Sequence, residues 1–543
     1  MSFKNSLIYL NQFFFFIYTK LREFYLNSKI YNRKISRIRK NNLEYKPSPS
    51  LLECIVKIKK EKNNISDLSL DKIWFKKNIN SKEFINLHSF FWLFTLDLNS
   101  PKREVQSTIS EWIDKNYNYN HLTWEIDILS KRIISWISNA KITYEDSGDN
   151  YKEKFDWIIK KQVNHLINEI NQSEWIDNKM IGCSAIILTG IAYNEKYFID
   201  YGSILLRRII KVSFDRHGFP KTRNLRQLNF YLKYFILIRE WLKESQNEIG
   251  EYLDEIIYHL GQAFTLINKN VNYNFLFNGN HNNIDKNLEN QIKKLGYNFK
   301  NDLDQVGDYL LLKNKNFTLA ADLGHSPERN YSKDYQSGAL SFEFISNKNK
   351  IITNSGYFQK SKHQLNLISK FTASQTTLSI GNSSSVNFLK CSDGTNIINN
   401  SLKVFDKKII SNKNLWSFEA SHDGYIKRYG IIHQRKVEFF HNNFKLTGSD
   451  NIIKKKKFRS TNFEIRFHLV PNAKILKTQD GKSIYIEIEK EGWKFTSSTN
   501  KIDFETGLYF GHKNSFVENQ NIFISGKISE QDNPILWEIE KVR

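Results

Sequence analysis

Residues 416–440 read "WSFEASHDGYIKRYGIIHQRKVEFF", and this stretch decides the fold of the C-terminal half. Aromatic and β-branched residues flank the Asp423-Gly424 pair, a dipeptide favoured in tight turns between antiparallel strands. We therefore predict a β-hairpin that turns at Asp423-Gly424. The hairpin also carries His422, His433 and Arg435, which a plain surface hairpin does not need.

The same alternation of apolar and polar residues continues through most of the chain after residue 300. It recurs in "LSFEFIS" (340–346), "TTLSIGN" (376–382), "FEIRFHLV" (463–470) and "SIYIEIEKEGWKF" (483–495), with Asn, Gly, Asp and Ser between them. Many strands at short spacing predict a large antiparallel β-sandwich.

Before residue 300 the apolar residues recur at helical spacing instead. Examples are residues 154–171, 225–245 and 251–270. The middle of 225–245 is apolar nearly all round, which predicts an inner, buried helix. Helices joined by short connections indicate an array of antiparallel helical hairpins. We predict an α+β multidomain protein with a helical extension at 1–95, a helical domain at 96–300 and a β-sandwich domain at 301–543.

The formal net charge is +23, which favours polyanionic partners such as an acidic polysaccharide, anionic lipid or nucleic acid. The alternative is compositional, since the chain is rich in Lys, Asn and Ile. We find no nucleic-acid recognition motif and expect no such partner. Three scattered cysteines give no disulfide framework. The N-terminal aromatic run is too short to span a bilayer, but with Lys20 and Arg22 it could form a membrane-surface helix.

An ordered set of motifs resembles the heparinase II/III-like proteins, and most closely their α-proteobacterial variants. The helical part holds "HLTWEIDILSKRIISWISNA" (121–140), "FDRHGFPKTRNL" (214–225) and "LFNGN" (276–280). The sandwich part holds "GALSFEFISNKNKIITNSGYF" (338–358), "SHDGYIKRYGIIHQRK" (421–436), "LTGSD" (446–450) and "FEIRFHLVPNA" (463–473). The resemblance implies an incomplete α/α toroid followed by an antiparallel β-sandwich.

The resemblance also implies a carbon–oxygen lyase that cleaves a uronic-acid polysaccharide by β-elimination. That reaction needs a donor that neutralises the substrate carboxylate, a base for the C5 proton and an acid for the leaving oxygen. Arg, Asn and His suit the first role, and Tyr and His suit the others. A tyrosine base needs its pKa lowered, for example by cationic neighbours.

The chain departs from the family at three positions that hold a metal in its zinc-containing members. Gln336, Asn354 and Gln375 stand there, and neutral amides are poor zinc ligands. We expect no metal at this place and no cofactor. A further departure is Gln227, which stands near the place of the family's catalytic tyrosine, with Tyr231 one helical turn later.

The candidate site residues follow from these motifs. We expect Arg223 to bind the substrate carboxylate through its guanidinium, or else to pair with a nearby acid of the protein. The candidate catalytic residues are His217, Arg223, Tyr231 and Tyr335, and the candidate substrate-binding residues are Asn178, Asn224, Asn280, His281, Gln336, His422, Tyr425 and Arg435. For the turn at His422 a structural role is favoured. We expect the groove that holds these residues to be net positive.

Two hypotheses of different classes remain open. The first is a metal-free polysaccharide lyase acting on an acidic glycan. The second is a non-catalytic acidic-glycan-binding or envelope polysaccharide assembly protein that retains the lyase fold, which the three amides favour. Trp112, Trp124 and Trp136 are interpreted as core residues. The family implies action in the cell envelope or periplasm, although the N-terminus shows no clear signal peptide.

Overall fold

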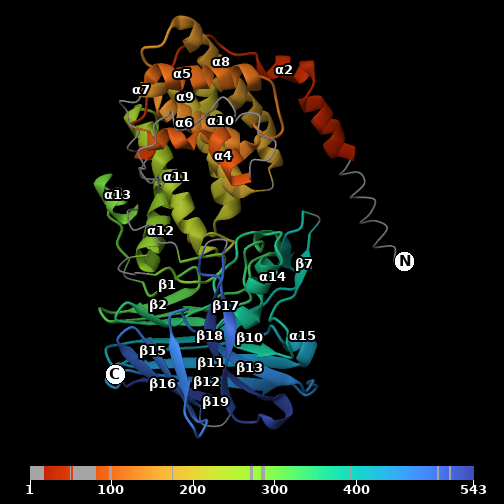
Figure 1. Ribbon diagram of the computed structural model, residues 1–543, viewed down its shortest axis with the longest axis vertical. Coiled ribbons are helices and arrows are strands. Elements are labelled where there is room, and N and C mark those ends of the chain that lie inside the picture. Colours follow the sequence, from red (N-terminus) through yellow and green to blue (C-terminus); the bar gives the residue numbers. More distant parts are fainter. Residues whose placement is uncertain are drawn as a thin grey trace. The chain divides into compact units, whose positions relative to one another are not determined.

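The computed structural model describes residues 17–48, 51–52, 81–96, 101–173, 175–268, 273–282, 288–301, 303–391, 393–497, 501–512 and 515–542. The chain forms two compact units, one of Met1–Val212 with Tyr231–Ile257 and one of Ser213–Phe230 with Tyr258–Arg543 (Figure 1). The domain boundaries predicted at residues 95 and 300 stay a prediction.

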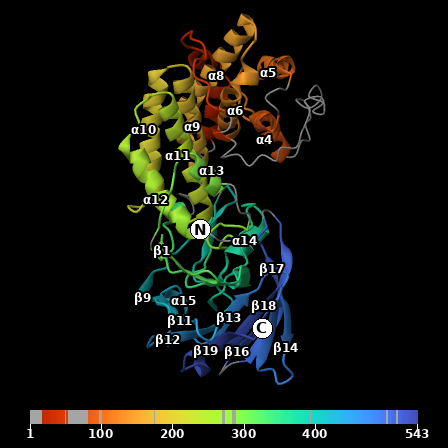
Figure 2. The ribbon, with the colours of Figure 1, turned by 90° about the vertical axis from the view of Figure 1, so that its left-hand side faces the viewer.

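The first unit is helical. Its longer helices are α5 (Lys102–Asn116), α6 (Ile126–Ser138), α8 (Asp149–Glu169), α9 (Ile176–Ala192), α10 (Lys196–Ser213) and α11 (Leu225–Glu244), with the shorter α2 (Lys29–Ile35), α4 (Ser81–Ser89) and α7 (Ala140–Thr143). Every residue of α9 from Met180 to Ala192 is buried, because α6 and α8 pack against it. Figure 2 shows these helices packed side by side. The helix predicted at 225–245 is confirmed as α11, and its middle is buried on most sides.

The tryptophans at positions 112, 124 and 136 belong to the core of the helical unit, as predicted. Trp112, Trp124 and Trp136 are at most 1% exposed. The Arg132 guanidinium lies over the Trp112 ring at 4.1 Å, and its Nη1 donates to the carbonyl oxygens of His88 and Thr123, both at 2.9 Å. These contacts replace the water that a buried cation would lose.

In the part that the structure describes, the second unit holds three larger antiparallel sheets. The five-stranded sheet has the order β1 (Gln305–Val306), β2 (Tyr309–Lys313), β3 (Phe317–Asp322), β4 (Phe342–Ser346), β5 (Asn349–Ile352). The eight-stranded sheet has the order β14 (Lys474–Lys477), β15 (Ser483–Ile488), β16 (Glu491–Ser497), β19 (Ile535–Lys541), β12 (Lys445–Lys454), β11 (Ile431–Phe440), β10 (Leu415–His422), β9 (Val404–Ser411). The four-stranded sheet has the order β17 (Lys501–Tyr509), β18 (Val517–Lys527), β13 (Asn462–His468), β6 (Leu378–Ile380), and β7 (Phe388–Lys390) pairs with β8 (Asn396–Ile398). The unit also contains most of α12 (Glu251–Asn268), with α13 (Leu288–Lys294) and α14 (Gln364–Lys370).

Aromatic side chains join the sheets face to face. Phe467 on β13 lies 4.9 Å from Phe495 on β16, between ring centroids. Phe344 on β4 lies 5.0 Å from Phe439 on β11. Both smaller sheets therefore pack on the eight-stranded sheet, and the alternating residues that predicted the strands form this common core.

The predicted hairpin at 416–440 is present, but its predicted turn is wrong. Strands β10 and β11 pair in antiparallel register, with His422 opposite His433. The connection is not a two-residue turn at Asp423-Gly424, because it also contains the short helix α15 (Ile426–Tyr429). Gly430, at φ 69°, ends that helix in the left-handed conformation that favours glycine.

The N-terminal prediction concerns residues that lie mostly outside the described part. In the described ranges, no helix is long and apolar enough to cross a membrane. A membrane-surface role of the segment that includes Lys20 and Arg22 stays a prediction.

Candidate functional site

A cavity of about 690 Å³ lies within the second unit. Its wall comes from the loop 215–223, from α12, from residues 301–308 and from the segment 325–331. His217 and His325 are exposed on it, whereas Arg223 is buried. Loops at the ends of strands and helices thus form this cavity, where binding sites are commonly built.

Local hydrogen bonds shape the loop before α11. Asp215 Oδ1 accepts from the backbone N–H groups of His217 (2.8 Å) and Phe219 (2.9 Å), which closes a tight turn. Gly218 has φ 71°, and a Cβ there would meet His259 Cβ at 2.5 Å, so glycine is required. Asn224 Oδ1 accepts from Arg226 N at 2.9 Å and caps the start of α11.

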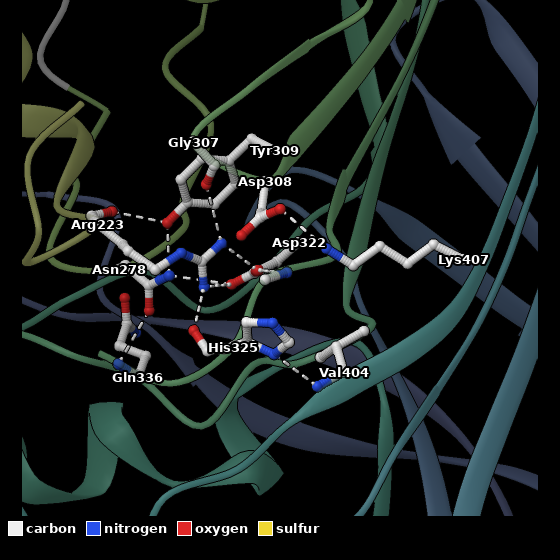
Figure 3. Close-up of polar contacts among 11 residues, drawn as sticks. Arg223, Asn278, Gly307, Asp308, Tyr309, Asp322, His325, Gln336, Val404 and Lys407 are labelled. Atoms are coloured by element: carbon white, nitrogen blue, oxygen red, sulfur yellow. Dashed lines mark hydrogen bonds and ion pairs between the residues drawn. The ribbon is translucent and has the colours of Figure 1, made fainter. Parts of the chain in front are cut away.

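An ion pair organises the buried side of the cavity (Figure 3). Arg223 Nη2 lies 2.7 Å from Asp322 Oδ1, and Nη1 also donates to the carbonyl oxygen of His325 at 3.1 Å. The guanidinium carbon stands 4.7 Å from the Tyr309 ring centroid. Burial alone would lower the pKa of Arg223, but Asp322 raises it above its ordinary value. The structure thus gives the second alternative for Arg223: its guanidinium binds an acid of the protein, which corrects its expected role on a substrate carboxylate.

The ion pair is held by a second set of hydrogen bonds. Asn278 Nδ2 donates to Asp322 Oδ2 at 2.9 Å, and the Tyr309 hydroxyl donates to the carbonyl oxygen of Arg223 at 2.7 Å. Arg223 itself has φ 59°, a left-handed conformation that is costly for a residue with a Cβ. These bonds stabilise that conformation, so the cavity wall is built around Arg223.

His325 lines the cavity next to this ion pair, and Lys407 lies beside Asp308, as Figure 3 shows. His325 Nδ1 accepts from Val404 N at 2.9 Å, so the neutral ring carries its proton on Nε2. Burial and the Lys407 ammonium lower the pKa of His325, which keeps the ring neutral. Lys407 Nζ donates to Asp308 Oδ1 at 2.8 Å; burial opposes ionisation of Asp308, yet this bond and the Arg223 charge hold its pKa below the usual value.

The charge of the lining differs from the expectation of a net positive groove. Its cations are Lys221 and Arg223, and its carboxylates are Asp215, Asp308 and Glu328. Because Asp322 and Lys407 each pair with one of these residues, most charges are internally balanced. Attraction of an anion in this cavity would rest on local donors rather than on an overall positive field.

Tyr335 has no exposed surface, and its hydroxyl finds no hydrogen-bond partner among the described residues. Burial and Asp322 raise its pKa, the opposite of what a tyrosine base needs. Asn224 Nδ2 donates to Asp334 Oδ2 (2.8 Å), and Asn280 Nδ2 donates to the carbonyl oxygen of Phe275 (2.8 Å). With the buried His281, these residues hold loops and do not line the cavity. Their catalytic or binding roles stay predictions.

The three amides at the implied metal place lie close together and bind protein groups. Gln336 Nε2 donates to the carbonyl oxygens of Gly356 (2.9 Å) and Ser369 (2.7 Å), and Gln375 Nε2 donates to that of Ser369 at 3.3 Å. Asn354 Oδ1 accepts from Thr376 N at 2.8 Å. These amides do not fit a zinc ion, since zinc prefers imidazole, thiolate and carboxylate ligands. Across the ranges that the structure describes, no cluster of three or more His, Cys, Asp or Glu residues could hold a metal.

The polar hairpin residues form a buried chain of hydrogen bonds in the sandwich. His422 Nδ1 accepts from Gly424 N (3.2 Å), His422 Nε2 meets His433 Nδ1 (3.2 Å), and His433 Nε2 meets Asp450 Oδ1 (2.7 Å). Arg435 Nε donates to the same carboxylate oxygen at 2.7 Å. The structural role favoured from sequence is thus observed for His422.

The remaining members of the hairpin are equally enclosed. The Tyr425 hydroxyl donates to the carbonyl oxygen of Leu378 at 2.8 Å, and Arg435 Nη1 donates to that of Thr376 at 2.8 Å. Both side chains are at most 1% exposed. His422, Tyr425 and Arg435 are therefore not placed to touch a glycan.

Two candidates lie in the helical unit. The buried Tyr231 hydroxyl donates to Asp177 Oδ1 at 3.3 Å, and Asn178 Nδ2 donates to Glu125 Oε1 at 3.3 Å. Burial of Tyr231 limits its access to a substrate, whereas Asn178 is half-buried. Their proposed roles stay predictions.

Sequence reasoning missed three groups that line the cavity, namely Lys221, His259 and Tyr331. Lys221 Nζ lies 5.7 Å from the centroid of the Tyr331 ring. Burial and Glu328 raise the pKa of Tyr331, so its hydroxyl keeps its proton near neutral pH. Lys221 stands inside the quoted motif "FDRHGFPKTRNL", but no local pattern in the sequence indicates that Tyr331 approaches it.

A comparison with protein families finds a match for most of the second unit. Residues 300–538 match the family described as "Heparinase II/III-like, C-terminal". No protein with a curated description matches the chain significantly. The resemblance inferred from the motifs is confirmed by this match.

Several solved structures share the fold at low sequence identity. Heparinase III has a TM-score of 0.67 at 14% identity, covering 94% of this chain and 88% of that chain. The heparinase III product of BT4657 has a TM-score of 0.68 at 12% identity over 93% and 87%. Heparan sulfate lyase HepC from Pedobacter heparinus has a TM-score of 0.63 at 13% identity over 94% and 87%. The predicted fold class, an incomplete α/α toroid followed by an antiparallel β-sandwich, is confirmed.

Proposed function

We propose that this chain, whose residues 300–538 match the family described as "Heparinase II/III-like, C-terminal", is a polysaccharide lyase that cleaves a uronic-acid glycan by β-elimination. One observation carries the proposal: a cavity of about 690 Å³ in the second unit, walled partly by the family-matched residues, combines a lysine, three histidines and a tyrosine. β-Elimination needs these kinds of group, namely a donor for the carboxylate, a base and an acid.

The first step assigned to the cavity is neutralisation of the substrate carboxylate. The Lys221 ammonium and the Nε2–H group of the neutral His325 are the donors. Neutralisation stabilises the negative charge that develops next to the carboxylate when C5 loses its proton. Arg223 acts as a positioning residue, because its Nη1 and Nη2 groups already donate to Asp322 and to the carbonyl oxygen of His325.

Proton transfer then completes the elimination. An imidazole of the cavity, His217 or His259, takes the C5 proton, and histidine suits this role near neutral pH. The electron pair of the C5–H bond forms the C4–C5 double bond, and the C4–O bond breaks. Tyr331, which its raised pKa keeps protonated near neutral pH, gives its proton to the leaving oxygen. The chemistry proposed here uses no metal, because the amides Gln336, Asn354 and Gln375 do not supply suitable ligands.

A second function is favoured by a specific observation. Tyr335 is buried with a raised pKa, and the three amides are bound to protein groups. A protein that binds an acidic glycan without cleaving it, or that takes part in envelope polysaccharide assembly, would tolerate both features. Cell-envelope location is part of the same proposal, and fractionation of the native cells followed by immunodetection tests it.

The test separates the two functions. The protein is incubated with a panel of uronic-acid polysaccharides while ultraviolet absorbance of unsaturated uronides is followed and binding is measured by calorimetry. Lyase activity predicts new absorbance that is lost in Lys221→Ala and Tyr331→Phe. Binding without absorbance supports the second function. Neither binding nor absorbance with any acidic glycan contradicts both.

A further inference from the structure

A second cavity, of about 560 Å³, lies in the helical unit and takes no part in the proposed elimination. One wall is helix α8, and the other is the extended segment 36–42. All of its lining residues belong to the first compact unit, so its shape is set within that unit.

A buried lysine fixes the two walls to each other. Lys160 on α8 is 2% exposed, and its Nζ donates to the carbonyl oxygens of Arg39 (3.1 Å) and Asn41 (2.7 Å). The same ammonium stands 4.5 Å from the centroid of the Tyr193 ring. The segment 36–42 is thereby anchored in an ordered conformation, although it has no regular secondary structure.

The floor of the second cavity is polar and also ordered. Asp156 accepts hydrogen bonds from the hydroxyls of Tyr144 (3.0 Å) and Tyr193 (2.8 Å). Burial raises the pKa of Asp156 to about 6 in spite of these bonds. The carboxylate of Asp156 is thus held at a defined position, where it accepts hydrogen bonds.

The rim carries cations that the protein neutralises poorly. The side chains of Arg39 and Lys40 are 87% and 93% exposed, and their carboxylate neighbours, Glu195 and Glu153, lie at 4.0 and 3.9 Å. Lys154 and Lys160 add two further cations to the lining, against the carboxylates of Glu153 and Asp156. The lining side chains thus carry a formal charge of +2, and one of these cations, Lys154, also pairs with Asp114 outside the lining at 2.7 Å.

An indole completes the second cavity. Trp157 is half-buried on the wall, and the Lys161 ammonium lies 4.7 Å from the centroid of its ring. An aromatic surface beside amides and cations is suited to a sugar ring that carries an anion. The side chain of Asn42 supplies an amide group that can bind hydroxyls, whereas that of Asn41 is already bound by Tyr193 and Lys160.

We propose that the second cavity binds one acidic sugar unit, with its anionic group at Arg39 and Lys40 and its ring against Trp157. The ligand class rests on the proposed function, but the binding does not require cleavage. A polymer held at such a point has an increased effective concentration at any other site that it can reach. The site would thus retain an acidic polysaccharide whether or not the protein is a lyase.

Calorimetry with a short oligogalacturonide tests this proposal in the Lys221→Ala background, which removes the cationic donor of the first cavity and leaves the Nε2–H group of His325. The double variant Arg39→Ser/Lys40→Ser should weaken binding at least tenfold. The matched control Arg33→Ser/Lys34→Ser removes the same charge from the same region, outside the lining, and should change binding less than twofold. An equal loss in both double variants, or no loss in the first, overturns the proposal.

Two further ligands separate a sugar site from a general anion site. Trp157→Leu should weaken binding of the oligogalacturonide several-fold and leave binding of inorganic phosphate unchanged, since phosphate has no ring to contact the indole. A neutral malto-oligosaccharide should not bind measurably. Equal binding of the neutral sugar, or binding of phosphate alone, contradicts the proposal. These experiments measure binding constants and the lyase assay measures absorbance. A negative binding result therefore contradicts the second site without contradicting the lyase activity.

Discussion

The Arg223 guanidinium and the Asp322 carboxylate meet at 2.7 Å, with side chains that are 9% and 2% exposed. Residues 99 positions apart in the chain thus form one buried charge pair, and the wall of the first cavity is built on it. The Arg223 side chain lies in a loop that resembles a binding loop. Because it already pairs with Asp322, it is not available to bind a substrate carboxylate through two hydrogen bonds.

Removing one member of this pair should mainly affect stability. Arg223→Ala leaves Asp322 buried without its cation, which should lower the free energy of unfolding by about 3–5 kcal/mol. Urea denaturation measures this change. The double variant Arg223→Met/Asp322→Leu should recover much of the loss, because no buried charge is left unpaired. A fully stable Arg223→Ala protein would show that the pair does not organise the wall.

Gly324 should be indispensable for the position of Arg223. A Cβ at residue 324 would stand 2.1 Å from the guanidinium carbon, so Gly324→Ala must displace the side chain or the loop. We expect a loss of about 1–3 kcal/mol, as for other overpacked sites. Gly148→Ala is the control, because its Cβ would meet no atom within 4 Å, and it should cost no more than about 1 kcal/mol. Similar melting temperatures for both variants would contradict this account.

The free energy of unfolding should fall below neutral pH because of His422 and His433, which are buried in the hydrogen-bonded chain of the sandwich. Burial lowers the pKa of His422 and of His433, so both stay neutral in the folded protein. The unfolded chain takes up these protons below about pH 6.5, and folded stability is present above that pH and lost below it. Each histidine should contribute a slope of up to about 1.4 kcal/mol per pH unit.

His422→Gln tests this slope. The variant removes one titrating group, so its free energy of unfolding should fall less steeply between pH 6.5 and 5 than that of the unchanged protein. Urea titrations at several pH values give both slopes. An identical slope would mean that His422 does not titrate between the two states. Asp450 acts at lower pH: burial opposes its ionisation, but Arg435 and His433 hold its pKa far below the usual value, and that stability is lost only in strong acid.

Because Gln336, Asn354 and Gln375 are poor zinc ligands, we expect the protein to be stable without bound zinc. Purified protein should contain no stoichiometric zinc, and a chelator should leave the melting temperature unchanged. Gln336→Glu should destabilise the fold by about 2–4 kcal/mol, because a carboxylate would face the carbonyl oxygens of Gly356 and Ser369 that now accept from Nε2. One tightly bound zinc per chain in elemental analysis would refute this expectation.

The sequence predicts the architecture better than the site. Period-two and helical patterns identified α11, β4 and β13, because burial on one face or all round dictates residue type directly. The turn after His422 was mispredicted, since Asp423-Gly424 fits a short turn as well as the start of a longer connection.

The candidate site depends on contacts that no local pattern encodes. Arg223 was identified as a cation at a helix entry, but its partner Asp322 lies at the end of a distant strand. Likewise, Tyr335 precedes a strand like an exposed loop residue, yet tertiary packing buries it completely. The approach of Lys221 to Tyr331 is also visible only in three dimensions.

The most direct measurement of the central claim is the ultraviolet absorbance of unsaturated uronide during incubation with a uronic-acid polysaccharide panel. The account predicts new absorbance with at least one member, lost by at least a hundredfold in Lys221→Ala/Tyr331→Phe, which removes a carboxylate donor and the acid. Melting curves show whether this double variant is folded. Absorbance that is retained in a folded double variant, or absent with every acidic glycan that binds, would contradict the assignment of β-elimination to this cavity.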